Sequence, residues 1–387
     1  MGQKGRDYKR NDKLKILFIC SSVEPGRDGV GDYTRRLAIE LIRQGHSVVA
    51  LSLNDLFIAE VYEGLQHSEE LDLQVLRLPA TISQKNKLTI AKKYIDEFDP
   101  DWISLQFVIF GYQKKGLPYQ LGKQLAAIGA GRSWHIMFHE LWVGMEKATS
   151  LKYLIWGKIQ RLLIKSLISK IRPKSIHTHT SLYQHQLAGL GFSSSNLALF
   201  GNIPRVRNSN IKLTDNASVD QGNTMNFVLF GHIFPNAPVE DFANEVYEYA
   251  TNNKIAISLT VIGRCGGEQA VWVKKWESLN FKVNVFGEQP ADVISETLES
   301  ASFGLSTTPI ALIEKSGTVA AMREHNLPVI CVPFLWEPRG FDEVEVPAGI
   351  ALYKKGNLET IFANKGKSGV PNNVTLISVQ LVNSLLT

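Results

Sequence analysis

Short apolar runs alternate with helical patterns along most of the chain. In the first half, runs of strand length lie at residues 15–20, 48–53, 75–78, 102–107 and 134–139, and the polar segment at 175–180 also looks like a strand. A glycine loop and a helical pattern, with apolar positions at Tyr33, Leu37, Ile39 and Leu41, separate the first two runs. Continuous apolar runs are typical of parallel strands buried on both faces. Strand, glycine loop, helix and strand form the opening unit of a Rossmann-like domain.

The same alternation restarts in the second half. The expected strands lie at residues 226–230, 257–262, 283–286, 303–306 and 328–332, and the expected helices at 239–251, 269–278, 291–300, 319–325 and 373–386. Alternation at this spacing predicts a second parallel sheet with helices on both faces. We therefore expect an α/β protein with two Rossmann-like domains.

A stretch without periodicity, rich in Asn, Asp and Ser, separates the two halves and marks the domain boundary. The expected organisation is a disordered basic tail at 1–14, a first domain at 15–205, a linker at 206–224, a second domain at 225–370, and a C-terminal helix at 371–387 that packs back on the first domain. A chain of 387 residues suits two domains of similar size.

Composition narrows the class of protein. The net charge of +5 is too small to imply nucleic acid, and the 3 cysteines lie far apart, against a disulfide framework or a thiolate metal site. No apolar run reaches the roughly 18 residues that span a membrane, and the basic N-terminus has no apolar segment after it. We expect a cytoplasmic protein in a reducing compartment.

Two short motifs favour structural interpretations. The spacing Gly26-x-x-Gly29-x-Gly31 differs from the dinucleotide fingerprint, so a nicotinamide enzyme is not favoured. Asp99-Pro100-Asp101 has the spacing of a metal–nucleotide site, but it precedes a strand, whereas ligands of open parallel sheets lie at the carboxyl ends. We interpret it as a turn.

The stretch at residues 309–333 carries the most suggestive chemistry. Lys315-Ser316-Gly317-Thr318 directly precedes the expected helix, with Ser316 or Thr318 as N-cap. A helix N-terminus carries about half a positive charge and unpaired N–H groups, so it suits a phosphate. On this window alone, an ordinary capped strand–loop–helix is the favoured interpretation.

Histidines form a second candidate group. His139-Glu140 follows a strand, where an α/β site lies, so His139 either donates to a substrate oxygen or caps the next helix. His177 and His179 share one face of their strand, as two metal ligands might. Because no third ligand stands nearby, packing and hydrogen bonding are favoured.

Residues 150–174 form a long basic helical pattern without an acidic residue. Such a helix can lie on an anionic membrane surface, at the inner face of the cell membrane. A helix that faces the core and exposes a basic side to water fits the pattern equally well.

Several stretches together resemble glycosyltransferase family 4. Residues 15–51, KILFICSSVEPGRDGVGDYTRRLAIELIRQGHSVVAL, are similar to that family's opening. Further similar pieces are Phe138-His139-Glu140, FGNIP at 200–204, Phe230-Gly231, residues 259–263, Phe286-Gly287 and the stretch through 328–330. The resemblance implies the GT-B fold, in which two Rossmann-like domains face each other across a cleft, with the acceptor-side domain first and the donor domain second.

The resemblance also implies a site. The catalytic candidates are His139, Glu314 and Lys315; the donor-binding candidates are Gly29, Gly31, Gly231, His232, Gly263, Arg264, Gly287, Glu288, Ser316, Gly317 and Thr318. Family 4 enzymes retain the anomeric configuration, and Lys315 with the backbone amides of residues 316–318 would stabilise the leaving diphosphate without a metal.

The sequence departs from the family at several functional positions. The usual two glutamates before the Pro-Val pair fall at Ile313, beside Glu314, and at Ala321. The usual Arg and Lys after the second domain's first strand read His232 and approximately Ala237. These departures motivate an alternative, a non-catalytic GT-B protein that binds a nucleotide or glycan or scaffolds a partner.

The sequence as a whole favours a retaining glycosyltransferase. It would move a sugar from a nucleotide-sugar donor to a glycan or lipid-linked acceptor in polysaccharide or glycoconjugate synthesis, with no cofactor, no metal and no nucleic acid. A GT-B sugar-nucleotide epimerase is a third reading, and it needs more acid–base residues than the sequence places in the site.

Overall fold

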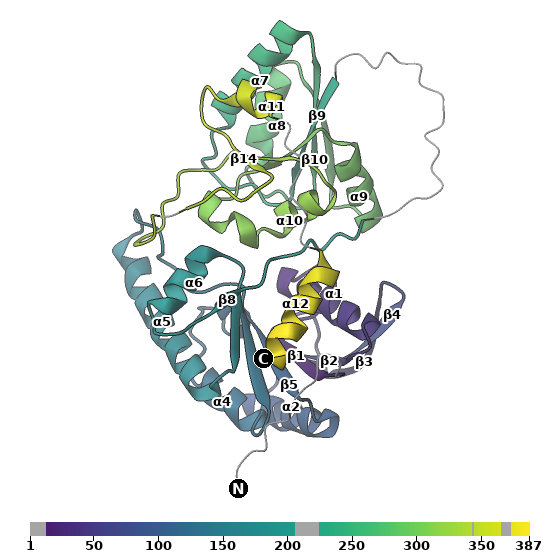
Figure 1. The fold of residues 1–387 in the computed structure, drawn as a ribbon, viewed down its shortest axis with the longest axis vertical. Coiled ribbons are helices and arrows are strands. Elements are labelled where there is room, and N and C mark those ends of the chain that lie inside the picture. The colour runs from purple at the N-terminus through teal and green to yellow at the C-terminus, as the bar shows by residue number, and fades with distance from the viewer. Residues whose placement is uncertain (1–12, 206–223, 343, 365–372) are drawn as a thin grey trace. The chain divides into compact units, whose positions relative to one another are not determined.

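The computed structural model describes residues 13–205, 224–342, 344–364 and 373–387 (Figure 1). The chain divides into two compact units: Met1–Ala198 with Val374–Thr387, and Leu199–Asn373. The division falls earlier than the expected boundary at residue 205. The expected basic tail and linker fall almost entirely outside the described residues.

Unit 1 is built on an eight-stranded sheet in the order β3-β4-β2-β1-β5-β6-β7-β8. Every described pairing is parallel except β3–β4. The strands are β1 (Lys15–Cys20), β2 (Ser47–Asp55), β3 (Tyr62–Ser68), β4 (Leu71–Pro79), β5 (Trp102–Phe107), β6 (Ser133–Phe138), β7 (Ser175–Thr178) and β8 (Ser195–Asn196). β1 and β5 are almost completely buried, as their continuous apolar runs predict.

The helices of unit 1 are α1 (Gly29–Arg43), α2 (Gln84–Phe98), α3 (Ile109–Tyr112), α4 (Leu121–Ile128), α5 (Leu151–Ile171), α6 (Ser181–Ala188) and α12 (Val374–Leu386). The C-terminal helix α12 joins this unit by packing on α1, where Gln44 Nε2 donates to Ser378 Oγ over 2.6 Å. The most N-terminal and most C-terminal described segments are therefore parts of one unit.

Unit 2 has a six-stranded sheet, β11-β10-β9-β12-β13-β14, with every described pairing parallel. Its strands are β9 (Thr224–Phe230), β10 (Ala256–Ile262), β11 (Lys282–Gly287), β12 (Phe303–Ser306), β13 (Val329–Cys331) and β14 (Ile350–Leu352). Its helices are α7 (Val239–Asn253), α8 (Gln269–Ser278), α9 (Ala291–Ser300), the 3₁₀ helix η1 (Ile310–Lys315), α10 (Gly317–Glu324) and α11 (Leu358–Ala363).

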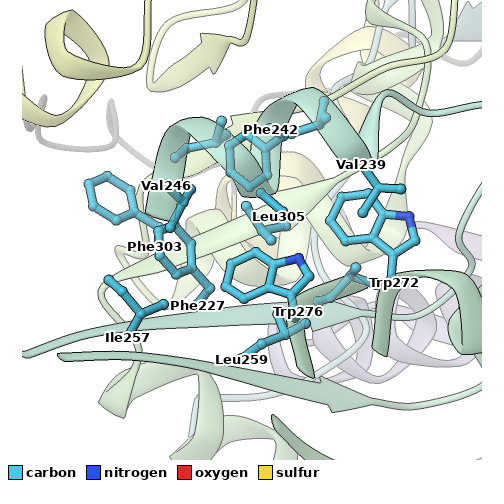
Figure 2. Packing of buried hydrophobic residues seen from close by; sticks show 14 of the residues in the cluster. Phe227, Val239, Phe242, Val246, Ile257, Leu259, Trp272, Trp276, Phe303 and Leu305 are labelled. Atoms are coloured by element: carbon cyan, nitrogen blue, oxygen red, sulfur yellow. The ribbon is translucent and has the colours of Figure 1, made fainter. Parts of the chain in front are cut away.

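Aromatic side chains fill the core on one face of the second sheet (Figure 2). Phe227 of β9 meets Trp276 of α8 with ring centroids 5.4 Å apart, and Phe242 of α7 lies 6.3 Å from the same indole. Large rings buried in this way contribute strongly to packing. These ring contacts hold α7 and α8 on the face of the sheet. The loops after the strands form its carboxyl edge.

Candidate functional site

The carboxyl edge of the unit 2 sheet carries three glycine bends. Gly231, Gly263 and Gly287 have φ of 76°, 89° and 65°, and they lie at the ends of β9, β10 and β11. Gly263 N–H donates to Gly287 O over 2.7 Å, and Gly231 N–H donates to Ile262 O over 2.9 Å. These positive φ angles suit glycine, so the bends hold adjacent loop backbones at one edge.

Helix α10 begins beside the first of these bends. Ser316 is its N-cap, with the side chain accepting from Val319 N–H over 3.4 Å. The helix starts two residues before the predicted residue 319, so Gly317 and Thr318 form its first turn. A Cβ at Gly231 would lie only 2.6 Å from Thr318 Cγ2. The fold therefore brings Gly231 against the positive end of α10.

The two other candidates from this stretch lie in η1 rather than in an open loop. Lys315 is half-buried and Glu314 is exposed. Burial lowers the pKa of the Arg323 guanidinium, and the negative charge of Glu314 opposes that shift. Glu314 therefore acts electrostatically on Arg323 of the following helix, which the sequence did not indicate.

The remaining donor-binding candidates lie near the same edge. Arg264 Nε is 3.5 Å from Glu288 Oε2, and both side chains are largely exposed. Exposed ion pairs of this kind contribute little to stability, so an anion can replace Glu288 at small cost. His232 is exposed and contacts Phe234, with ring centroids 4.9 Å apart.

The segment before the linker packs on α10. Gly201 N–H donates to the buried Glu324 Oε1 over 2.9 Å, and a Cβ at Gly201 would lie 2.7 Å from the Cα of Ala321. A glutamate at position 321 would carry its charge into this fully buried contact. The close approach requires glycine at position 201, and the full burial of Ala321 disfavours a charged side chain there.

In unit 1, the glycine loop after β1 leads into α1. Carboxylates from this loop and from the first turn of α1 accept backbone N–H groups of the helix start and of the loop. Asp28 Oδ1 accepts from Val30 N–H and Gly31 N–H over 2.9 and 3.1 Å, and Asp32 Oδ1 accepts from Gly26 N–H over 3.0 Å. A phosphate at this helix start would meet two carboxylates, so an approach of the donor through Gly29 and Gly31 stays a prediction. A Cβ at Gly31 would lie 2.6 Å from Ser22 O, so Gly31 serves close packing.

A buried ionic group holds this loop in place. Arg77 of β4 donates through Nε to Asp55 Oδ2 over 2.8 Å, and it also pairs with Glu24 of the loop. Burial raises the pKa of Asp55, but the hydrogen bonds and charge of Arg77, helped by Phe57 N–H and Ser52, bring it below the usual value. An arginine within the apolar run at residues 75–78 was the available sequence signal for this group.

His139 belongs to a buried hydrogen-bonded chain across β5, β6 and β7. Its Nε2 is 2.9 Å from Gln106 Oε1, and its Nδ1 is 3.0 Å from His179 Nε2. His179 Nδ1 donates to Leu197 O over 2.9 Å. Since both nitrogens of His139 already contact protein groups, a bond from His139 to a substrate requires one of these contacts to break.

The chain continues toward the other edge of the sheet. Gln106 Nε2 donates to Ser104 Oγ over 2.8 Å, Ser104 Oγ is 2.8 Å from His135 Nδ1, and His135 Nε2 is 3.0 Å from His177 Nδ1. Burial lowers the pKa of His135 well below its usual value and that of His177 to about 4. The interpretation of the strand histidines as packing and hydrogen-bonding groups is confirmed.

The described part of the chain contains no cluster of metal-ligating side chains. Within it, no group of three or more His, Cys, Asp or Glu side chains is arranged to hold a metal ion. Asp99 and Asp101, the other pair considered as ligands, lie at the amino end of β5, where Asp101 Oδ2 accepts from Lys15 N–H over 2.9 Å.

The basic helix α5 has two apolar faces. One face packs into unit 1 through Gly157, Gln160, Ile164, Leu167, Ile168 and Ile171. The opposite face exposes Leu151, Ile155, Ile159 and Leu162 to solvent. Lysines flank this exposed stripe, namely Lys152, Lys158, Lys165 and Lys170. Among the described residues, no helix is long and apolar enough to cross a membrane.

Comparisons in sequence identify no relative. No family model matches the chain, and no curated protein matches it.

Solved structures match the fold over nearly its full length. The chain is similar to HepE of Anabaena, in complex with UDP and glucose, with 14% identity, 96% and 99% coverage of the two chains and a TM-score of 0.57. The catalytic domain of starch synthase IV from Arabidopsis thaliana, bound to ADP and acarbose, matches with 11% identity, 97% and 96% coverage and a TM-score of 0.57. UDP-GlcNAc 2-epimerase from Neisseria meningitidis, bound to UDP-GlcNAc, matches with 10% identity, 96% and 100% coverage and a TM-score of 0.55.

These matches place the protein in a fold class. It has the two-sheet α/β fold of GT-B proteins, and the structures that share this fold include a glycosyltransferase from Rickettsia africae and UDP-GlcNAc 2-epimerases.

Proposed function

We propose that the protein is a glycosyltransferase that takes a sugar from a nucleoside-diphosphate donor. The observation that carries this proposal is the meeting of the Gly231 bend with the first turn of α10 in unit 2. Backbone N–H groups at a helix start and a glycine bend next to it suit a diphosphate. HepE was solved with UDP and glucose and also with UDP-glucose, which supports a nucleotide sugar as the ligand class.

In this proposal, unit 2 stabilises the leaving diphosphate. Lys315, the first-turn amides of α10 and Arg264 released from Glu288 supply positive charge as the bond to the sugar breaks. The chemistry then proceeds with retention of configuration and needs no metal ion, because the protein supplies the charge. His139 and Glu314 take part only if their present contacts rearrange around the substrates.

The test is nucleotide binding, followed by product analysis. UDP, GDP and ADP are titrated calorimetrically into the wild type, Lys315→Ala and Lys282→Ala; the last removes an exposed lysine from the opposite end of the sheet. Loss of a charge-assisted hydrogen bond worth about 1.5–3 kcal/mol weakens the nucleotide about 10- to 100-fold in Lys315→Ala. The Lys282→Ala variant should bind as the wild type does.

Incubation with UDP-glucose and UDP-GlcNAc then separates the candidate activities. Transfer of the sugar to an added glycan or lipid acceptor supports the proposal. Conversion of UDP-GlcNAc into its C2 epimer, without transfer, would instead identify an epimerase, a class represented among the similar folds. Nucleotide binding with neither product would favour the non-catalytic alternative, and no binding at all would contradict the assigned donor site.

The exposed stripe of α5 supports a lipid-linked acceptor. Four apolar side chains flanked by lysines match an anionic bilayer, because the apolar groups enter the interface while the lysines meet lipid headgroups. Arg161 stacks on Trp142 at 5.2 Å, so Lys158 and Lys165 are the better positions to change.

Liposome flotation tests this surface. A smaller fraction of the variant Lys158→Glu/Lys165→Glu than of the wild type should float with anionic vesicles. Each lysine charge removed should weaken the binding free energy by about 1 kcal/mol. The control Lys85→Glu/Lys274→Glu changes the same net charge at exposed positions outside α5. Equal flotation of both variants would remove the membrane surface from the proposal.

A further inference from the structure

Strand β3 forms one edge of the unit 1 sheet (Figure 1). It pairs antiparallel with β4, and within the described residues no other strand bonds to it. The register runs unbroken from Tyr62–Arg77 to Ser68–Leu71. Natural sheets commonly protect an exposed edge with Lys, Pro or a bulge, because its unpaired N–H and C=O groups accept a further strand. The sequence of β3, YEGLQHS, has none of these three devices, so this edge is suited to pairing.

The turn after β3 determines which backbone groups face outward. Glu69 and Glu70 have φ of 48° and 67° and form the two-residue turn to β4. The residues that flank such a turn, here Ser68 and Leu71, exchange hydrogen bonds with each other. Bonded and non-bonded pairs then alternate along the antiparallel ladder. The residues whose N–H and C=O groups point away from β4 are therefore Glu63, Leu65 and His67.

Ion pairs hold this hairpin on α1. Glu69 Oε1 lies 3.4 Å from Arg36 Nε, and Glu69 Oε2 lies 3.5 Å from Arg43 Nη2. Arg43 Nη2 also donates to the backbone oxygen of Glu69 over 3.3 Å. A strand that is already held in place loses little conformational freedom when a partner binds, so β3 is prepared for pairing.

Exposed side chains accompany the outward-facing backbone groups. Glu63, Leu65 and His67 lie on one face of the strand, because alternate residues of a strand share a face, and all three are exposed. Leu65 is 60% exposed. The exposed large apolar residues just before it are Leu56, Phe57, Val61 and Tyr62. Exposed apolar side chains gathered in this way mark an interaction surface.

The order of the three outward-facing residues makes β3 complementary to itself. In an antiparallel pair centred on Leu65, this residue meets the partner's Leu65, and Glu63 meets the partner's His67. An apolar pair and an acid–imidazole pair, directly opposed on one face, both favour pairing. The N–H and C=O groups of these residues also face each other and can bond. A shift by two residues in either direction would set Leu65 against Glu63 or His67, so the side chains specify one register.

We propose that the protein forms a homodimer in which β3 pairs antiparallel with β3 of a second copy. The twofold axis passes beside Leu65, and the two unit 1 sheets join into one. A twofold interface uses the same surface of both copies, which matches a self-complementary strand. Leu65 O accepts from Tyr62 Oη over 3.3 Å in the single chain and accepts from the partner's backbone in the dimer. The interface belongs to unit 1 and does not depend on nucleotide binding by unit 2.

Sedimentation velocity of the full chain tests the proposal between about 1 and 100 µM, the range of modest interfaces. The wild type should change from monomer to dimer as the concentration rises. Leu65→Lys replaces the apolar pair at the axis by two like charges and should weaken the dimer about tenfold. The control Leu56→Lys makes the same change at an exposed leucine outside β3 and should dimerise as the wild type does. Both leucines are largely exposed, so both variants should melt at the wild-type temperature.

A cysteine at position 65 tests the register. In Leu65→Cys, two thiols lie across the axis, and directly bonded residues of antiparallel strands have Cα atoms about 5.5 Å apart, within reach of a disulfide. Oxidation by air with copper phenanthroline should therefore give a covalent dimer of Leu65→Cys and none of Leu56→Cys. The 3 native cysteines are buried and do not compete.

Four outcomes would overturn the proposal. The first is a wild type that stays monomeric at every concentration. The second is a dimer that Leu65→Lys leaves unchanged, and the third is a dimer that Leu56→Lys weakens equally, which would indicate apolar association without strand pairing. The fourth is a dimer of Leu65→Cys that oxidation does not link, which would contradict the register centred on Leu65.

Discussion

Replacing Gly231 by Ala tests the arrangement on which the donor site depends. Gly231 has φ of 76°, and an L-residue in the left-handed region costs about 1–2 kcal/mol. The new Cβ would also lie 2.6 Å from Thr318 Cγ2. Overpacking of this kind costs about 1–3 kcal/mol, so Gly231→Ala should destabilise unit 2 by roughly 2–5 kcal/mol in total.

The two contributions can be separated, because only one of them involves Thr318. In Gly231→Ala/Thr318→Ser the Cγ2 atom is gone, and the nearest remaining atom of residue 318 is its Cβ at 3.7 Å, an ordinary contact distance. The overlap then disappears while the backbone strain stays. The double variant should therefore recover about 1–3 kcal/mol relative to the sum of the single variants.

Urea denaturation followed by hydrogen exchange suits this measurement. Exchange of peptides from β9 and α10 reports on unit 2 without the contribution of unit 1, where a single denaturation curve would combine the two. If the stability change of the double variant equals the sum of the two single changes, the close approach of Gly231 to the start of α10 is refuted. A Gly231→Ala variant as stable as the wild type would refute both the contact and the backbone strain.

Three further variants test buried contacts. Arg77→Met should lower the free energy of unfolding by about 3–5 kcal/mol, because it leaves Asp55 buried without its partner; the additional change Asp55→Asn should restore part of the loss, and no recovery would contradict the pairing. Burial lowers the pKa of His177 to about 4 in the folded protein, against a usual 6.5. As the pH falls from 6.5 toward 4, this histidine therefore takes up a proton in the unfolded chain before it does so in the folded one. The contribution of His177 to stability should decline across that window by up to about 1.4 kcal/mol per pH unit, so His177→Asn should make the decline in denaturation midpoints shallower, while the contribution of His135 remains. Glu324→Ala should cost about 1–3 kcal/mol by orphaning the N–H of Gly201, whereas Glu324→Gln, which keeps an acceptor, should cost less in the same assay.

The alternation of strands and helices could be predicted from the sequence because it depends on local patterns. The strand at 15–20, the helices at 269–278 and 291–300 and the strand at 303–306 have the bounds that the apolar runs indicate. The short antiparallel strand β3 was missed, because its residues alternate only weakly between apolar and polar.

The candidate site was predictable only in part. The N-cap of α10 was narrowed to Ser316 or Thr318, and the structure has Ser316; the glycines at 231, 263 and 287 were candidates through the resemblance, and they lie where strands end. The N-cap of α1 was not predicted, since a glycine-rich helix start looks the same in sequence whether or not a side chain caps it. In the structure, Asp28 caps this helix start through two hydrogen bonds.

The sequence by itself determined the class of fold, the order of its elements and the residue types available at each sheet edge. Only the tertiary structure decided which of them meet. Gly201 and Glu324 are 123 residues apart, and His139 and His179 are 40 apart, yet each pair is joined by a hydrogen bond. Such contacts depend on how strands and helices pack on one another, and the local periodicity of a sequence carries no record of that packing.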